Sequence, residues 1–226
     1  MDAWQGYSQQ LKTVYERLVE MHGELEHVPR REPMRELIST VLSQRTTHAD
    51  EELAYTRMLE RYEIWENVRD AIESELAHEL RSSRYPETKA RNIKAILSRL
   101  FDERGAADID FLAELSAAEG MTWLRSLPGV GLKTASLVLL FNFRKPVLPV
   151  DTHVHRICIR LGVLPPKTSA ERAHKLLLEM LPEEPYILYN FHKALYHHGQ
   201  RICSYSSPKC ERCPLTDVCA YYGARA

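Results

Sequence analysis

The chain has 226 residues, of which 44% are hydrophobic, and a formal net charge of -1. This length suits one large domain or two small ones, and the hydrophobic content excludes a disordered chain. No apolar run approaches the roughly 18 to 20 residues of a membrane span, and the first residues carry no secretory or transit pattern. We therefore expect a cytoplasmic protein with no membrane partner.

The near-zero net charge argues against a nucleic-acid partner, because the phosphate backbone favours basic surfaces. The charge is unevenly distributed, however: residues 1–120 hold 16 Lys/Arg and 24 Asp/Glu, whereas residues 121–226 hold 14 and 7. Within residues 121–160 a single acid, Asp151, stands among six basic residues. The pattern fits an anion-facing half of the protein, and the alternative is a chance excess of solvated charge.

Helical periodicity dominates the first half of the chain. Apolar residues recur at three and four spacings over residues 7–21, with Gly23 as a stop, and Pro33 suits the first turn of the next helix. Further helices are expected at 49–61, 66–80, 87–102, 109–114 and 117–126.

Helices also account for most of the second half. Thr168-x-x-Glu171 has the form of a capping box and opens a helix that Pro182 ends. Another helix is expected from 185 to 198, ending at Gly199. Alternating apolar and polar residues are nearly absent, and residues 145–150 are too few to found a sheet. The predicted fold is all-α, with ten or so short helices.

Residues 127–131 read Leu-Pro-Gly-Val-Gly and lie between two predicted helices. Gly129 and Gly131 tolerate positive φ, so a tight turn leading directly into a helix is expected. Backbone N–H groups at such a helix start can hold a phosphate. Leu127, Gly129, Val130 and Gly131 are therefore candidate phosphate-contacting residues, and an ordinary turn between helices is the alternative.

Lys133 follows this turn, and Asp151 lies further on in Pro-Val-Asp-Thr-His-Val-His-Arg. A lysine in the first turn of a helix lies at the positive end of the helix dipole, which disfavours the ammonium. A neutral amine is a nucleophile suited to Schiff-base chemistry. Asp151 begins its own helix and is a candidate for the base that takes the lysine proton or the anion that stabilises a cationic transition state. A surface salt bridge and an N-cap are the alternatives.

Four of the five cysteines are crowded near the C-terminus with the spacing C-x6-C-x2-C-x5-C: Cys203, Cys210, Cys213 and Cys219. Two disulfides are disfavoured by the odd cysteine and the missing secretion signal. Zinc usually takes two close cysteine pairs, whereas here one close pair is flanked by two longer spacings. A [4Fe-4S] cluster is therefore favoured over zinc. Cys158 lies in an apolar stretch and is expected in a core. Lys209 and Arg212 interleave with the ligands, which indicates a loop that contacts DNA phosphates.

Together, Leu-Pro-Gly-Val-Gly-x-Lys-Thr-Ala, Val-Asp-Thr-His-Val-x-Arg, His198-Gly199 and the cysteine spacing resemble the endonuclease III family of helix-hairpin-helix DNA glycosylases. The resemblance implies a six-helix barrel over 25–145. It also implies a second helical domain made of 1–24 and 146–226 that holds the [4Fe-4S] cluster, with the active-site cleft between the two domains. The implied partner is damaged double-stranded DNA, bound by a monomer associated with the nucleoid.

The resemblance also implies the chemistry. Lys133 would attack the sugar C1′ of an extruded damaged pyrimidine nucleotide, with Asp151 assisting, and the Schiff base would permit β-elimination of the 3′ phosphate. Base chemistry inside a duplex demands extrusion of the nucleotide. The expected function is a bifunctional DNA glycosylase/AP lyase of base excision repair that acts on oxidised pyrimidines.

Extrusion needs residues that fill the hole left in the base stack, and the family places a Gln-containing loop there. In this chain the loop is Leu42-Ser43-Gln44-Arg45-Thr46-Thr47-His48, so Gln44 or Arg45 is the candidate plug. His48 stands where the family commonly has Asp. Polar residues at a solvated helix end are the alternative reading of this loop.

The second wedge loop of the family usually reads Gly-Leu-Tyr or Gly-Phe-Tyr before a Lys-Ala-x-Asn-Ile helix. Here Ser83-Arg84-Tyr85-Pro86 replaces it, so the apolar wedge is gone and Arg84 and Tyr85 become the candidate DNA contacts. A guanidinium can stack on bases in place of an apolar wedge. This departure leaves two alternative functions: a divergent paralogue acting mainly at abasic sites, and a non-catalytic iron-sulfur DNA-binding or redox protein.

Overall fold

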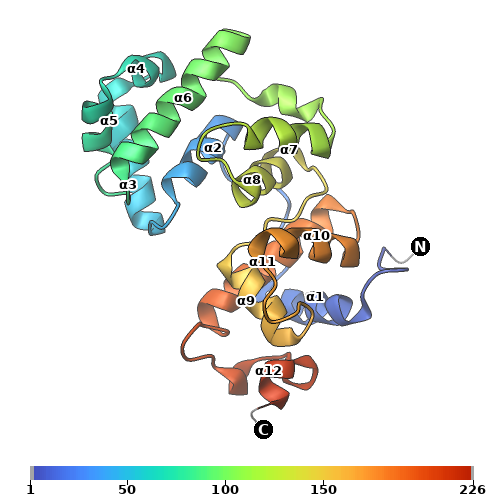
Figure 1. The fold of residues 1–226 in the computed structure, drawn as a ribbon. Coiled ribbons are helices and arrows are strands. Elements are labelled where there is room, and N and C mark those ends of the chain that lie inside the picture. The colour runs from blue at the N-terminus through green and yellow to red at the C-terminus, as the bar shows by residue number, and fades with distance from the viewer. Residues whose placement is uncertain (1–2, 225–226) are drawn as a thin grey trace. The chain divides into compact units, whose positions relative to one another are not determined.

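The computed structural model describes residues 3–224, which form twelve α-helices and three 3₁₀ helices with no strand in that range (Figure 1). The all-α prediction is confirmed. The chain divides into two compact units, one of residues 29–143 and one that joins residues up to Val28 to those from Arg144 onward. The domain limits expected from the resemblance, 25–145 and 1–24 with 146–226, stay a prediction. None of the helices in the described part of the chain has the length and apolar character needed to span a bilayer.

The continuous unit is built around its longest helix. That helix, α6, buries an apolar stripe that includes Ile93, Ile96 and Leu100, and α4 and α5 lie alongside it (Figure 1). The elements of this unit are α2 (Pro33–Leu42), α3 (His48–Tyr62), α4 (Trp65–Asp70), α5 (Glu73–Glu79), α6 (Pro86–Arg104), η1 (Asp110–Ala113), α7 (Ala117–Arg125) and α8 (Leu132–Phe143).

The discontinuous unit packs an N-terminal helix against helices from the second half of the chain. Its central helix is α11, which contacts both α1 and α9 and buries Phe191. Cys158 is fully buried on α9, as expected for a core residue. The elements are α1 (Gln9–His22), α9 (Thr152–Leu161), α10 (Ala170–Met180), α11 (Pro185–Arg201), η2 (Cys210–Arg212), η3 (Thr216–Val218) and α12 (Ala220–Gly223).

The single helix predicted over 66–80 is wrong, because the chain forms two helices there. Residues Ala71 and Ile72 are extended between α4 and α5. The carbonyls of Arg69 and Ala71, freed by this break, both accept hydrogen bonds from the Lys94 ammonium on α6. A side chain from another helix thus supplies the hydrogen bonds that these carbonyls lack where the helix is interrupted. The helix expected at 109–114 is the 3₁₀ turn η1.

Two predicted helix ends in the second half are also wrong. The capping box at Thr168 shifts by one residue: Ser169 is the N-cap of α10, and its hydroxyl accepts from the Arg172 N–H. Thr168 is instead held in a turn, with its N–H bonded to the Pro165 carbonyl. The helix expected to end at Gly199 continues to Arg201.

Candidate functional site

The turn over residues 127–131 connects α7 to α8 as the sequence predicts. Leu127 and Val130 are buried, at 3% and 5% exposure, and anchor the turn on the protein side. Gly129 has φ +75°, a value that favours glycine. Gly131 has no positive φ, so the positive φ considered for this second glycine is not found. The Gly131 carbonyl instead accepts from the Ala135 N–H at the start of α8.

Gly129 is also a point of close approach. A Cβ at this position would lie 2.4 Å from the Asn92 amide nitrogen of α6. The Gly129 carbonyl accepts a hydrogen bond of 2.7 Å from the Gln44 amide. Three segments far apart in the sequence therefore meet at this glycine. The close approach leaves no room for a side chain, and the positive φ favours glycine.

Lys133 is the second residue of α8, and its side chain is exposed. The core face of the same helix is apolar and includes Ala135, Val138 and Leu139. The lysine therefore lies at the positive end of a helix that is anchored by its opposite face. This is the position in a helix that we expect for a nucleophilic amine. Within its own unit the Lys133 amine makes no hydrogen bond or ion pair among the described residues.

Asp151 belongs to the discontinuous unit, where it is the N-cap of α9. Its Oδ1 accepts from the N–H groups of His153 and Val154, both at 2.8 Å. The expectation that Asp151 begins a helix is confirmed. These two bonds orient the carboxylate and leave Oδ2 for another partner. Lys133 and Asp151 lie in different units, so each is described here within its own unit.

The two candidate wedge loops contact each other within the continuous unit. The Arg84 N–H donates to the Thr46 hydroxyl at 3.0 Å. Arg45 and Tyr85 are exposed and have φ values of 54° and 59°. A left-handed backbone costs a residue with a side chain on the order of 1 kcal/mol, and such strain clusters at functional sites. The structure thus brings the candidates Gln44, Arg45, Arg84 and Tyr85 to one region.

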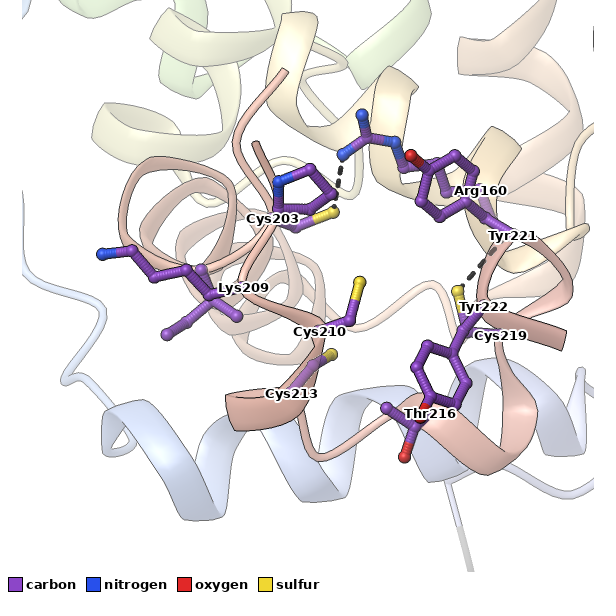
Figure 2. Close-up of a pocket in the computed structure, with 11 residues that line it drawn as sticks. Arg160, Cys203, Lys209, Cys210, Cys213, Thr216, Cys219, Tyr221 and Tyr222 are labelled. Carbon is purple, nitrogen blue, oxygen red and sulfur yellow. Dashed lines mark hydrogen bonds between the residues drawn. The ribbon is translucent and has the colours of Figure 1, made fainter. Parts of the chain in front are cut away.

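The four C-terminal cysteines surround one space, as Figure 2 shows. All four are free thiols, which excludes the disulfide alternative. The Cys203 sulfur accepts from the Arg160 guanidinium at 3.2 Å, and the Cys213 sulfur lies 3.4 Å from Nε2 of His198. Lys209 and Arg212, the predicted phosphate contacts, are exposed on the same loop.

Comparison with known proteins identifies the family. Residues 38–183 match the HhH-GPD superfamily of base excision DNA repair proteins, and residues 206–219 match the iron-sulfur binding domain of endonuclease III. The chain is 38% identical to endonuclease III of Thermotoga maritima over 86% of this chain and 85% of that protein. The chain belongs to the endonuclease III family.

Other relatives extend the comparison. A solved structure of a trapped endonuclease III–DNA covalent intermediate matches with a TM-score of 0.82 and 29% identity, covering 96% of this chain and 97% of that one. The chain is also 30% identical to protein ROS1A of Oryza sativa subsp. japonica over 71% of this chain, but it covers 9% of that longer protein. The expected enzyme class, a DNA glycosylase with AP lyase activity, is confirmed by these endonuclease III relatives.

The iron-sulfur cofactor predicted from the cysteine spacing is confirmed by the endonuclease III domain match. The local chemistry also fits a cluster better than one metal ion. Four thiolates on a single zinc, each about 2.3 Å from the metal, would lie within roughly 4 Å of one another. Among the described residues, no three cysteine sulfurs lie within 4.8 Å of one another. The donors are therefore spread as a multi-iron cluster requires.

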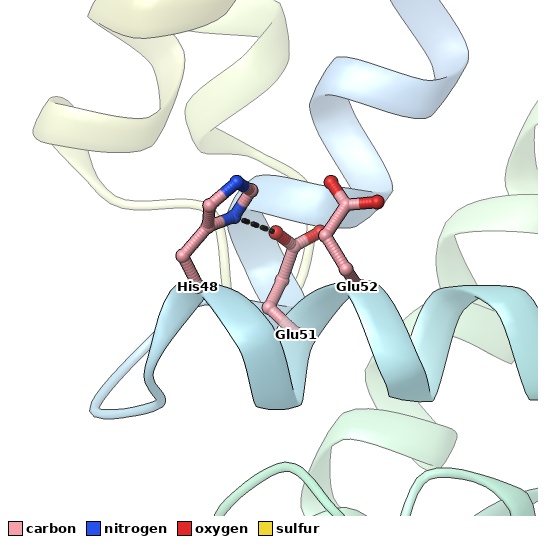
Figure 3. A group of neighbouring side chains, drawn as sticks. All are labelled: His48, Glu51 and Glu52. Carbon is pink, nitrogen blue, oxygen red and sulfur yellow. Dashed lines mark hydrogen bonds and ion pairs between the residues drawn. The ribbon is translucent and has the colours of Figure 1, made fainter.

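A cluster that the sequence did not predict lies at the start of α3. Ligand atoms of His48, Glu51 and Glu52 lie within 4.8 Å of one another (Figure 3). Arg31, however, is ion-paired with both glutamates, and Arg35 pairs with Glu52 at 2.9 Å. Because two guanidiniums already neutralise two carboxylates, this endonuclease III family member uses the group as an ion-pair network that anchors α3.

Sequence reasoning missed the residues that organise the endonuclease III loops, above all Lys89. Its ammonium bonds Leu42, Gln44 and Thr46. A signal was present in the sequence: Lys89 shares the helical stripe of Ile93 at the spacing of a core residue. A lysine on a buried stripe needs oxygen partners, and these could have been sought in the neighbouring loops.

Proposed function

We propose that the chain is a bifunctional DNA glycosylase/AP lyase that removes oxidised pyrimidines from duplex DNA and cleaves the strand at the resulting site. The observation that carries the proposal is the exposed Lys133 in the first turn of α8, directly after the glycine turn. Family membership and the likeness to a trapped covalent endonuclease III–DNA intermediate support it.

Base removal starts at the Lys133 amine. Its nitrogen forms a bond to the sugar C1′ of an extruded nucleotide while the bond from C1′ to the base breaks, and the base leaves with the electron pair and takes up a proton. Asp151 accepts the proton that the lysine loses, and its charge stabilises the cationic character at C1′. Opening of the sugar ring then gives an imine between C1′ and the Lys133 nitrogen.

Strand cleavage follows from the imine. The cationic imine withdraws electrons, so a C2′ proton is removed and the 3′ phosphate departs with the electrons of its C–O bond. Addition of water to the imine releases Lys133 and an unsaturated aldehyde on the sugar. Together the steps need only Lys133, Asp151, a proton acceptor for the C2′ proton, and water.

Phosphate binding is assigned to two segments. The backbone N–H groups of Gly129 and Gly131, in the turn that Leu127 and Val130 anchor, and the exposed cations Lys209 and Arg212 contact phosphates. These contacts position the duplex without reading sequence. Cys203, Cys210, Cys213 and Cys219 would hold the [4Fe-4S] cluster, which when bound fixes the loop that carries these cations.

Arg45 is assigned as the plug that fills the base stack, rather than Gln44. The Gln44 amide is engaged with the Gly129 carbonyl, whereas the Arg45 side chain is exposed and makes no hydrogen bond or ion pair among residues 3–224. Tyr85, beside Arg84, is 53% exposed and offers an aromatic face for stacking. The apolar residue of the family's wedge is thus replaced by the cation Arg84, and the tyrosine that follows it is kept as Tyr85.

The altered wedge favours one second candidate, an enzyme that acts mainly at abasic sites, where no base has to be unstacked. Cleavage of two matched duplexes, one with thymine glycol and one with an abasic site, separates the candidates. We expect cleavage of both. Cleavage of the abasic duplex alone would establish the second candidate, and cleavage of neither would favour a non-catalytic DNA-binding or redox protein.

A further inference from the structure

Lys89 is a buried lysine on α6, with 3% of the residue exposed. Its Nζ donates to the Leu42 carbonyl at 2.5 Å, to the Gln44 carbonyl at 3.0 Å and to the Thr46 hydroxyl at 2.9 Å. All three acceptors lie at the end of α2 or in the loop that follows it. The three donors of the ammonium are thereby matched by three oxygen atoms in the candidate plug loop.

The Thr46 hydroxyl carries this network into the second loop. Besides the bond from Lys89, it accepts from the Arg84 N–H at 3.0 Å and donates to the Gln44 carbonyl at 3.1 Å. A hydroxyl has one hydrogen and two lone pairs, so this one is fully used. The backbone beside Tyr85, which has φ 59°, is thus tied to the loop that carries Arg45.

The same face of α6 also reaches the glycine turn. Asn92 lies three residues after Lys89 and packs against Gly129, where a Cβ would lie 2.4 Å from its amide nitrogen. From the other side, the Gln44 amide donates to the Gly129 carbonyl at 2.7 Å. Lys89 and Asn92 therefore connect three candidate DNA-contacting segments: the plug loop, the second loop and the glycine turn.

Burial of this charge is unfavourable in itself. Loss of solvent lowers the pKa of Lys89 to about 8, and the charge of Glu51 opposes that shift. The carbonyls at the end of α2 are the negative end of its dipole and stabilise the ammonium there. An apolar side chain would fill the same position without desolvating a charge. What it could not do is bond three loop oxygens and hold two left-handed residues, Arg45 and Tyr85, in place.

We propose that Lys89 is a positioning residue for nucleotide extrusion: it holds the plug loop, the second loop and the glycine turn as one preorganised DNA-facing surface. The inference rests on the proposed function and adds a residue that touches neither DNA nor the reacting atoms. Preorganisation lowers the cost of unpairing and unstacking, because the loops need not be ordered as the base leaves the helix.

The test compares two substrates that differ in their need for extrusion. Single-turnover base removal is measured on a thymine glycol duplex, and strand cleavage is measured on a single-stranded oligonucleotide with an abasic site. Lys89→Met should lower the first rate about 10- to 100-fold relative to the second. Thr46→Val, which removes only the hydroxyl relay, should lower it by a smaller factor. A 2-aminopurine opposite the lesion should report slower unstacking in both variants.

The matched control is Lys94→Met on the same helix. The Lys94 ammonium also bonds two carbonyls, those of Arg69 and Ala71, but these lie at the C-terminal end of α4 rather than in the DNA-facing loops. We expect its duplex to single-strand ratio to equal that of the wild type. An unchanged ratio in both Lys89→Met and Thr46→Val, or an equal drop in Lys94→Met, overturns the inference. If the wild type acts on neither substrate, the proposed function itself fails.

Discussion

Asp151→Asn separates the charge of the carboxylate from its structural role. The residue caps α9 through two backbone N–H groups that both bond Oδ1. Asparagine keeps an oxygen at this place and is as good an N-cap as aspartate. Only the attraction between the charge and the helix dipole is lost, about 0.3 to 1 kcal/mol. The melting temperature should therefore fall by no more than about 4 °C.

The effect on base removal should be far larger. A positioned general base contributes about 10²- to 10⁴-fold, which is about 2.7 to 5.4 kcal/mol at 1.36 kcal/mol for each factor of ten. Single-turnover base release should fall by that factor, while binding to a duplex with a non-cleavable nucleotide analogue stays within a few-fold. A fall in binding as large as the fall in base release would refute the role assigned to Asp151.

Ser169→Ala is the control for this experiment. It removes the hydroxyl that caps α10 in the same unit and should cost about 0.5 to 2 kcal/mol of stability. That range overlaps the one expected for Asp151→Asn and extends above it, yet base release should stay at the wild-type rate. Slow base release in Ser169→Ala would mean that cap loss alone impairs the enzyme.

Two further changes test the local structure. Gly129→Ala should lower stability by about 1 kcal/mol or more, since φ is +75° and the new Cβ would meet Asn92; thermal unfolding checks this, and a wild-type melting temperature would contradict it. Burial lowers the pKa of His197 from 6.5 to about 4. Between these two values the unfolded chain binds more protons than the folded one, so the free energy of unfolding falls as the pH drops. The fall is at most about 1.4 kcal/mol per pH unit and is smaller because the ring is partly exposed. Between neutral pH and about pH 5 the melting temperature of His197→Gln should fall by less than that of the wild type. Equal falls would contradict the lowered pKa of His197.

The features that follow from local chemistry were predictable from the sequence. Gly23 ends α1, Pro33 opens α2 and Asp151 caps α9, because each depends on one residue type at one backbone position. The glycine turn and the gathered cysteines are local patterns as well. Short-range rules were therefore sufficient for the all-helical class and for locating the candidate residues, while the chemistry expected of those residues came from the family resemblance.

The features that depend on distant contacts were not predictable in this way. Gly199 looks like a helix end, yet α11 continues through it to Arg201. A Cβ at this position would lie 2.5 Å from the His153 ring. The glycine is required by packing, not by a left-handed backbone. The break between α4 and α5 likewise depends on Lys94, a residue more than twenty positions away.

The candidate DNA-contacting loops combine both cases. The sequence identifies the segments by their likeness to a family pattern, but it could not choose between Gln44 and Arg45. That choice rests on a hydrogen bond from Gln44 to Gly129, eighty-five positions away. Pairwise contacts of this length are set by the tertiary fold, so no local rule contains them.

The central claim is that Lys133 forms a covalent imine with DNA. Borohydride reduces such an imine to a stable bond between protein and oligonucleotide, so trapping across a panel of lesion duplexes tests the claim directly. We predict a covalent adduct with the wild type on duplexes that carry oxidised pyrimidines or an abasic site, and its loss in Lys133→Ala. No adduct on any lesion, or an undiminished adduct in Lys133→Ala, would contradict the account.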